Sequence, residues 1–126
     1  MFATLLQVAL GGALGASARY LTGVATIRII GPGFPWGTLT VNVAGSFCMG
    51  VLVVALAHTN ATARLAPFLM TGVLGGFTTF SAFSLDAVAL YERGQIMAAA
   101  AYVAASVILS LAGIAAGLLA ARAMLA

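Results

Sequence analysis

The sequence predicts an all-α integral membrane protein. Of its 126 residues, 63% are hydrophobic and only 6% are charged. Soluble domains carry about 25% charged residues, so this chain has too few to cover a water-facing surface. The hydrophobic residues fall into four long runs, and each run is long enough for a helix to cross a bilayer. We therefore expect a single domain of four transmembrane helices over residues 1–126.

Polar and turn-forming residues set the ends of the four runs. The cluster from Gly31 to Trp36 is rich in glycine and proline, which interrupt helices, and the segment 58–60 closes the second run. Residues 1–18 carry no side-chain charge and lack the basic region of a cleavable signal peptide, so we expect them to be retained as a span. The predicted spans cover approximately residues 2–24, 37–57, 65–91 and 96–121.

The first two spans combine small residues with a few polar ones. Gly11 and Gly15 are spaced by four, a pattern that lets a second helix approach closely. Arg19 and Tyr20 near the end of the first span suit an anchor at the membrane interface. Asn42 in the second span needs a partner, because an unpaired amide in hydrocarbon is unfavourable by several kcal/mol, roughly.

The third span is predicted to be a helix broken in mid-membrane. Gly75-Gly76 lowers helix propensity, and the hydroxyls of Thr78-Thr79 compete for backbone partners. Broken helices occur at membrane depth only where protein or a wet cavity satisfies the freed backbone groups. We therefore expect this stretch to hold an ion with its exposed backbone. Phe77, Phe80 and Phe83 place aromatic rings along one side of the second half-helix.

Polar residues of the last two spans are each open to two interpretations. Tyr102, Ser106 and Ser110 are spaced by four and align on one face of the fourth span. They either form a polar track or, for the serines, bond the carbonyl four residues back. Asp86 is either a functional intramembrane acid or a carboxylate that reaches the interface or pairs with an arginine.

The arginines give almost no preferred orientation. With four spans, Arg64 and Arg122 lie on the side of the termini, Arg28 and Arg93 lie on the other side, and Arg19 lies near that second edge. The positive-inside rule therefore cannot fix one orientation. A chain that inserts both ways can form an antiparallel dimer with a two-fold axis in the membrane plane. We predict a dual-topology homodimer.

Residue chemistry favours passage of an anion and argues against catalysis. One histidine, one cysteine and two acids lie on different segments, with no zinc spacing or phosphate loop, so no enzyme is predicted. The scattered arginines form no basic cluster for nucleic acid. Hydroxyl and amide hydrogens suit a small anion, and phenylalanine rings add a positive edge. The alternative is that the hydroxyls satisfy backbone and the rings fill the core. The neutral donors inside the spans are Asn42, Thr78, Thr79, Ser81, Ser84, Tyr102, Ser106 and Ser110.

Three motifs resemble the Fluc/CrcB family of fluoride channels. Residues 11–20 read GGALGASARY, residues 37–47 read GTLTVNVAGSF, and residues 72–84 read GVLGGFTTFSAFS. The similarity covers all four spans, and the two central motifs are highly specific. Two departures are visible: Ala82 stands where the family commonly has threonine, and Asp86 stands where it often has glutamate.

The resemblance implies an antiparallel homodimer with two fluoride pores and a structural sodium ion at its centre. Backbone carbonyls of Gly75 and Thr78, two from each subunit, would hold the sodium ion, and Arg19 would lie in the pore vestibule. The expected ion pathway comprises Asn42, Thr79, Phe80, Ser81, Phe83, Tyr102, Ser106 and Ser110.

The function expected from the sequence is passive, fluoride-selective export across the cell (inner) membrane. One alternative is a small multidrug-type, proton-coupled exporter, which needs an acid in the first span where this chain has none. A second alternative is a structural membrane subunit that transports nothing. That alternative leaves Asn42 and the hydroxyls beside a broken helix unexplained.

Overall fold

The computed structural model describes all residues 1–126, and its regular elements are all helices, which confirms the all-α prediction. Three stretches are long and apolar enough to cross a membrane: Trp36–His58, Thr62–Glu92 and Ile96–Leu125. The 28-residue helix α1 is not among them, so a fourth crossing stays a prediction. The elements are α1 (Phe2–Ile29), α2 (Trp36–His58), α3 (Thr62–Ala66), the π-helix η1 (Pro67–Leu74), α4 (Gly75–Phe77), α5 (Phe80–Glu92) and α6 (Ile96–Leu125).

The outer helices are longer than the sequence suggested. Helix α1 continues past the predicted span of about residues 2–24 to Ile29, because no glycine or proline occurs between Val24 and Gly31, whose φ is +114°. Helix α6 likewise continues past the predicted span of about residues 96–121 to Leu125. Its last residues are alanine, arginine, methionine and leucine, which all favour helix. The apolar length of a span and the length of its helix are therefore set by different residues.

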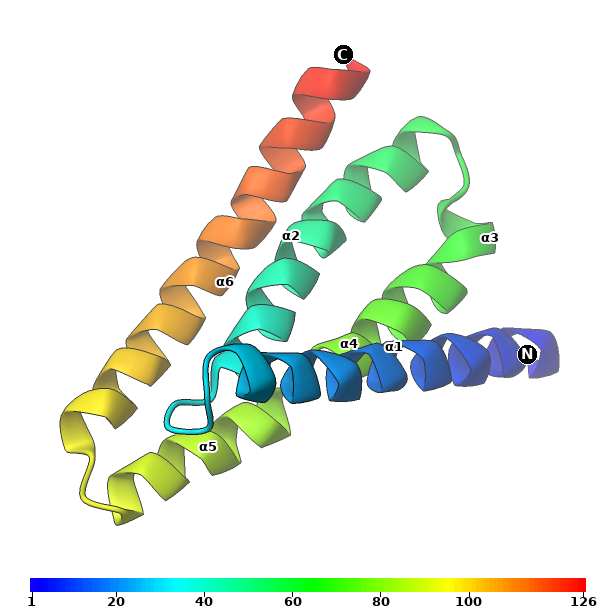
Figure 1. Cartoon of the computed structure of the whole chain (residues 1–126). Helices are drawn as coiled ribbons and strands as arrows, with labels where there is room; N and C mark the ends of the chain where they lie inside the picture. The colour runs from blue at the N-terminus through cyan, green and yellow to red at the C-terminus, as the bar shows by residue number, and fades with distance from the viewer.

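The helices form two packed pairs that are joined by a bent third segment (Figure 1). Helices α2 and α6 run side by side in the same direction and make the most extensive contact in the molecule. Helix α1 lies along η1 and α4. Helix α5 packs against α6 and makes only a small contact with α2. The position of α5 therefore depends on a small number of side chains.

Glycine allows α1 to pack closely against the third segment. A Cβ atom at Gly76 would lie 2.6 Å from the carbonyl oxygen of Gly12, too close for any side chain. Gly11 and Gly15 likewise face the backbone of η1. The π-helix begins at Pro67, whose missing N–H removes one helical hydrogen bond. The small-residue spacing of the first span thus serves contact within one chain.

The third segment changes from helix to extended backbone at the threonine pair. The glycines are helical, since α4 runs from Gly75 to Phe77. Thr78 (φ −87°, ψ 160°) and Thr79 (φ −155°, ψ 123°) are extended, and α5 begins at Phe80. Of the two pairs expected to disturb this segment, the threonines leave the helical conformation. The glycines instead supply the close contact with α1.

Little of the chain is buried. Only 17 of 126 residues are buried, and the main cluster of them lies between α2, α5 and α6. Large hydrophobic side chains are exposed along every long helix, as expected of a surface that faces lipid or a second chain. The buried cluster consists of Leu39, Phe83, Leu90, Ala99 and Tyr102.

Candidate ion pathway

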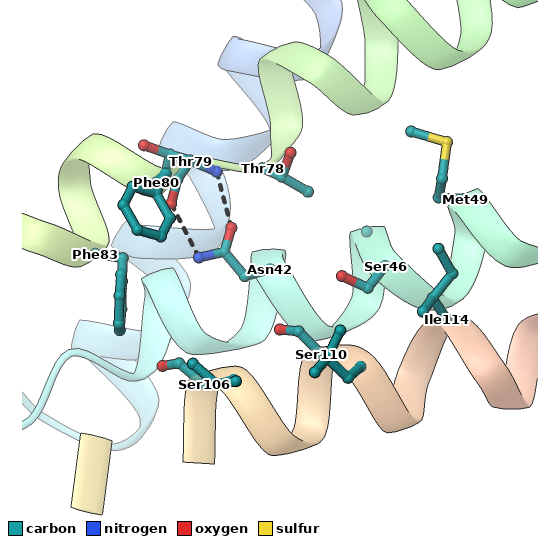
Figure 2. A pocket seen from close by; sticks show the side chains of 13 residues that line it. Asn42, Ser46, Met49, Thr78, Thr79, Phe80, Phe83, Ser106, Ser110 and Ile114 are labelled. Atoms are coloured by element: carbon teal, nitrogen blue, oxygen red, sulfur yellow. Dashed lines mark hydrogen bonds between the residues drawn. The ribbon is translucent and has the colours of Figure 1, made fainter. Parts of the chain in front are cut away.

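The extended threonine pair is held by the side chain of Asn42. Asn42 Nδ2 donates to the carbonyl oxygen of Thr79 at 3.0 Å, and the Thr79 N–H donates to Asn42 Oδ1 at 2.8 Å. The amide therefore satisfies both backbone groups of one extended residue, as Figure 2 shows with dashed lines. One amide hydrogen of Asn42 remains available, because a carboxamide NH₂ has two. The partner that the sequence analysis required for Asn42 is thus a peptide group.

Side chains replace helical hydrogen bonds on both sides of the pair. In a continuous helix the Thr79 N–H would donate to the Gly75 carbonyl, but it donates to Asn42. The Ala82 N–H would donate to the Thr78 carbonyl, but it donates to Thr79 Oγ1 at 3.1 Å, as at a helix N-cap. The carbonyls of Gly75 and Thr78 are therefore both deprived of their helical donors.

Arg19 satisfies a third carbonyl at the same place. Its Nε donates to the Gly76 carbonyl oxygen at 3.0 Å, across the contact between α1 and α4. Thr78 turns its own hydroxyl back to the carbonyl of Leu74 at 2.9 Å. The carbonyls of Leu74 and Gly76 therefore accept hydrogen bonds from side chains, whereas those of Gly75 and Thr78 have lost their helical donors.

An open groove of about 420 Å³ lies against the threonine pair, between α2, α5 and α6. The side chains around it come from all three helices and from the extended residues (Figure 2). None of them is charged, and six carry an amide or a hydroxyl. The polar lining residues are Asn42, Ser46, Thr78, Thr79, Ser106 and Ser110, and the apolar side chains among the rest are Met49, Phe80, Phe83, Val107, Leu111 and Ile114.

Ser106 is the most unusual polar group of the groove. It is buried, and its Oγ has no hydrogen-bond partner. Ser84, by contrast, donates to the carbonyl four residues back at 3.0 Å. No such bond is formed by Ser106 or Ser110, so the backbone-bonding interpretation of these two serines does not hold. A buried hydroxyl without a partner is unfavourable, which favours a ligand that accepts from it.

Phenylalanine rings form the wall of the groove beside the threonine pair. Phe80 and Phe83 have ring centroids 5.4 Å apart and both line the groove. Phe83 is buried, whereas Phe80 is 78% exposed. An aromatic ring this exposed on a membrane-capable segment faces lipid or another chain.

Two residues of the predicted pathway, Ser81 and Tyr102, lie outside the groove lining, and so does Arg19, which was expected in the pore vestibule. Ser81 is exposed, with its Oγ 3.3 Å from Thr79 Oγ1. Tyr102 is fully buried, and its hydroxyl donates to Asp86 Oδ2 at 3.1 Å. Arg19 lies on α1 and is bonded to the Gly76 carbonyl. Of the interpretations offered for Asp86, the structure shows a pairing, but with a tyrosine.

No group of His, Cys, Asp and Glu is arranged to hold a metal ion. The oxygen atoms that suit a hard cation are the carbonyls of Gly75 and Thr78, because they have lost their helical donors. Gly75 is also exposed in the single chain. A cation here would have to be completed by oxygens from elsewhere, since two carbonyls alone do not fill its coordination.

Comparison with known proteins gives a family. A family described as "CrcB-like protein, Camphor Resistance (CrcB)" matches residues 6–118. The chain belongs to the CrcB family. The resemblance found in the three motifs is therefore confirmed. Together with the three membrane-capable helices, it identifies a multi-pass membrane protein.

Curated relatives share the full length of this CrcB chain. A protein of Cereibacter sphaeroides is 70% identical over 126 residues, which is 100% of both chains. A protein of Ruegeria sp. is 59% identical over 126 residues (99% of both), and one of Paracoccus denitrificans is 57% identical over 123 residues (98% of both). Each of these relatives is named "Fluoride-specific ion channel FluC". The family is thus a transport family and not an enzyme family.

Six groove residues of this CrcB chain were not predicted as site residues: Gly45, Ser46, Met49, Val107, Leu111 and Ile114. Ser46 and Met49 line the groove from α2. They follow Asn42 by four and seven residues, so the helical period of α2 places all three on one face. The spacing of four and seven residues from Asn42 is the sequence signal that indicates Ser46 and Met49.

Proposed function

We propose that this chain is the subunit of a fluoride-specific ion channel that exports cytoplasmic fluoride. The observation that carries the proposal is the 70% identity, over the whole of both chains, to a relative named for that activity. The groove supports it independently, because a neutral, donor-rich lining suits a small anion. Cation pathways are more often ringed by acids, and no acid lines this groove.

The groove offers the fluoride ion replacements for water. The buried Ser106 hydroxyl has no protein partner, Ser110 lies one turn further along α6, and Asn42 keeps one amide hydrogen free. Edges of the Phe80 and Phe83 rings add weak positive charge. Larger halides fit poorly in a narrow path with short hydrogen bonds. Cations are repelled by the positive ends of the hydroxyl and amide dipoles.

The driving force follows from acid–base equilibrium. Hydrogen fluoride crosses membranes as a neutral weak acid and dissociates to H⁺ and F⁻ at the higher internal pH. The anion is then trapped unless it has a pathway through the hydrocarbon. A negative-inside potential drives F⁻ outward through a passive channel, so the expected location is the cell (inner) membrane.

Fluoride efflux from proteoliposomes tests this proposal. Vesicles are loaded with potassium fluoride, the potassium permeability is supplied by valinomycin, and an electrode records external fluoride. We expect rapid release that depends on the protein. Release no faster than from protein-free vesicles would reject the channel.

We further propose that the working unit is an antiparallel, dual-topology homodimer. The groove is open on one side, and the highly exposed Phe80 lies at its edge. Polar groove atoms left against lipid would be unsatisfied, so a second protein surface is needed to close the path. The balanced arginines favour insertion of the second copy in the opposite orientation.

Tags at the C-terminus give the orientation. A fusion that is active only in the cytoplasm and one that is active only in the periplasm should both report at Ala126 for the dual-topology chain. Adding arginines beside Arg122 should shift the balance to the cytoplasmic reporter. A signal from one side alone, with the unmodified sequence, would contradict dual topology.

A structural sodium ion is the third part of the proposal. The Gly75 and Thr78 carbonyls would hold it, with the same pair from the second subunit, and Arg19 bonded to Gly76 keeps that carbonyl occupied. When bound, the ion would supply a fixed positive charge that links the two threonine segments. Arg19 is proposed to add to the positive potential in the pore vestibule that attracts the anion.

A further inference from the structure

We propose that Phe34 is a positioning residue for the ion pathway, acting through Tyr102 on the ring of Phe83. The inference rests on the proposed channel function. Phe34 lies in the loop between α1 and α2 and does not line the groove. Its ring reaches the groove's aromatic wall indirectly, through one buried tyrosine.

Aromatic rings connect this loop to the groove in an unbroken series. The Phe34 ring meets the Tyr102 ring edge-on, with centroids 5.4 Å apart and an interplanar angle of 90°. The Tyr102 ring lies 5.3 Å from that of Phe83, and Phe83 lies 5.4 Å from Phe80. The series therefore ends on the two phenylalanines assigned to the pathway.

Tyr102 is fixed by three neighbours. Its ring contacts Phe83 and Phe34, and its hydroxyl donates to Asp86 at 3.1 Å. Phe83 and Asp86 both belong to α5, which packs on α6 and touches α2 only slightly. From outside the α5–α6 pair, Phe34 holds the ring of Tyr102 edge-on, and Leu39 of α2 packs in the same buried cluster. Loss of the Phe34 ring removes the edge-to-face contact of Tyr102, and we expect Tyr102 and Phe83 to shift as a result.

The loop itself is built to hold Phe34 in one place. Pro32 and Pro35 fix φ on either side of it, and the Trp36 N–H donates to the Phe34 carbonyl at 2.8 Å. Trp36 also covers the outer side of the Phe34 ring, with centroids 4.8 Å apart. Phe34 packs against the buried cluster that contains Phe83 and Tyr102. A loop that only joined two helices would not need this constraint.

The test measures fluoride efflux and chloride efflux per purified dimer. Phe34→Ala should lower fluoride efflux about tenfold, the factor associated with one edge-to-face ring pair, and should lower the fluoride-to-chloride ratio. Phe34→Leu keeps apolar volume without the ring edge and should fall by about threefold. Ile30→Ala is the matched control, because Ile30 lies in the same connection between α1 and α2 and its side chain is 58% exposed; it should stay within about twofold.

A merely structural role for Phe34 would reduce the yield of folded dimer and leave both rates per dimer unchanged. Unchanged rates and ratio in Phe34→Ala, beside a conducting wild type, would overturn the positioning role and leave the channel intact. A wild type that passes no fluoride would overturn the channel itself. If Phe34→Ala gives no dimer, Phe34→Leu decides, and wild-type rates and ratio in that variant would overturn the proposal.

Discussion

Replacing Asn42 with alanine is expected to reduce fluoride efflux to that of protein-free vesicles while the dimer still forms. The side chain holds both backbone groups of Thr79, at 2.8 and 3.0 Å. A buried backbone group left without a partner costs about 1–3 kcal/mol, and two such groups are lost at once. We expect Thr78 and Thr79 then to return to the helical conformation or to bind water. Either outcome removes the geometry that aligns Thr79, Phe80 and the groove.

Ser46→Ala is the matched control for this variant. Ser46 lies one turn after Asn42 on α2 and lines the same groove, but it holds no backbone group of the threonine pair. Its loss should therefore lower efflux only modestly. Efflux in Asn42→Ala above half the wild-type rate per dimer would show that the two hydrogen bonds between Asn42 and Thr79 are dispensable.

Phe80→Ile is expected to stop fluoride efflux as completely, for a different reason. Isoleucine keeps an apolar side chain of similar reach but has no ring, so the positive edge that faces an anion is lost. The pairing with Phe83 at 5.4 Å is lost as well. Because Phe80 is 78% exposed in the single chain, the substitution disturbs little of the subunit's own packing. The helix content of the purified subunit should stay near that of the wild type.

Phe2→Ile provides the comparison at matched exposure. Phe2 is 72% exposed and lies at the start of α1, away from the groove residues. Efflux should be unaffected there. Equal losses in the two variants would mean that exposed aromatic area in general, and not the ring at the groove, supports transport.

Helix positions could be predicted because they depend on local sequence. Composition gives apolar runs, and breakers such as the residues around Gly31 give their ends. Helices α1 and α6 continue to Ile29 and Leu125 because the apolar run stops before the helix does. Ser106 and Ser110 were placed on one face by spacing alone, and the structure brings both to the groove.

Contacts between distant segments could not be predicted. The partner of Asn42 lies 37 residues away, and nothing local to either residue indicates the pairing. The role of the glycine pair was equally hidden, since helix propensity describes Gly76 in isolation and not its contact with Gly12. Tyr102 follows the serine spacing, yet its hydroxyl donates to Asp86 of α5. This partner depends on how α5 packs against α6, which the spacing along α6 does not indicate.

Selectivity of the purified, reconstituted protein tests the central claim most directly. Vesicles loaded with equal fluoride and chloride would be followed with electrodes for both anions under the same valinomycin potential. Fluoride is expected to leave rapidly while chloride stays at the rate of protein-free vesicles. Equal release of the two halides, or release of neither, would contradict a fluoride-specific channel.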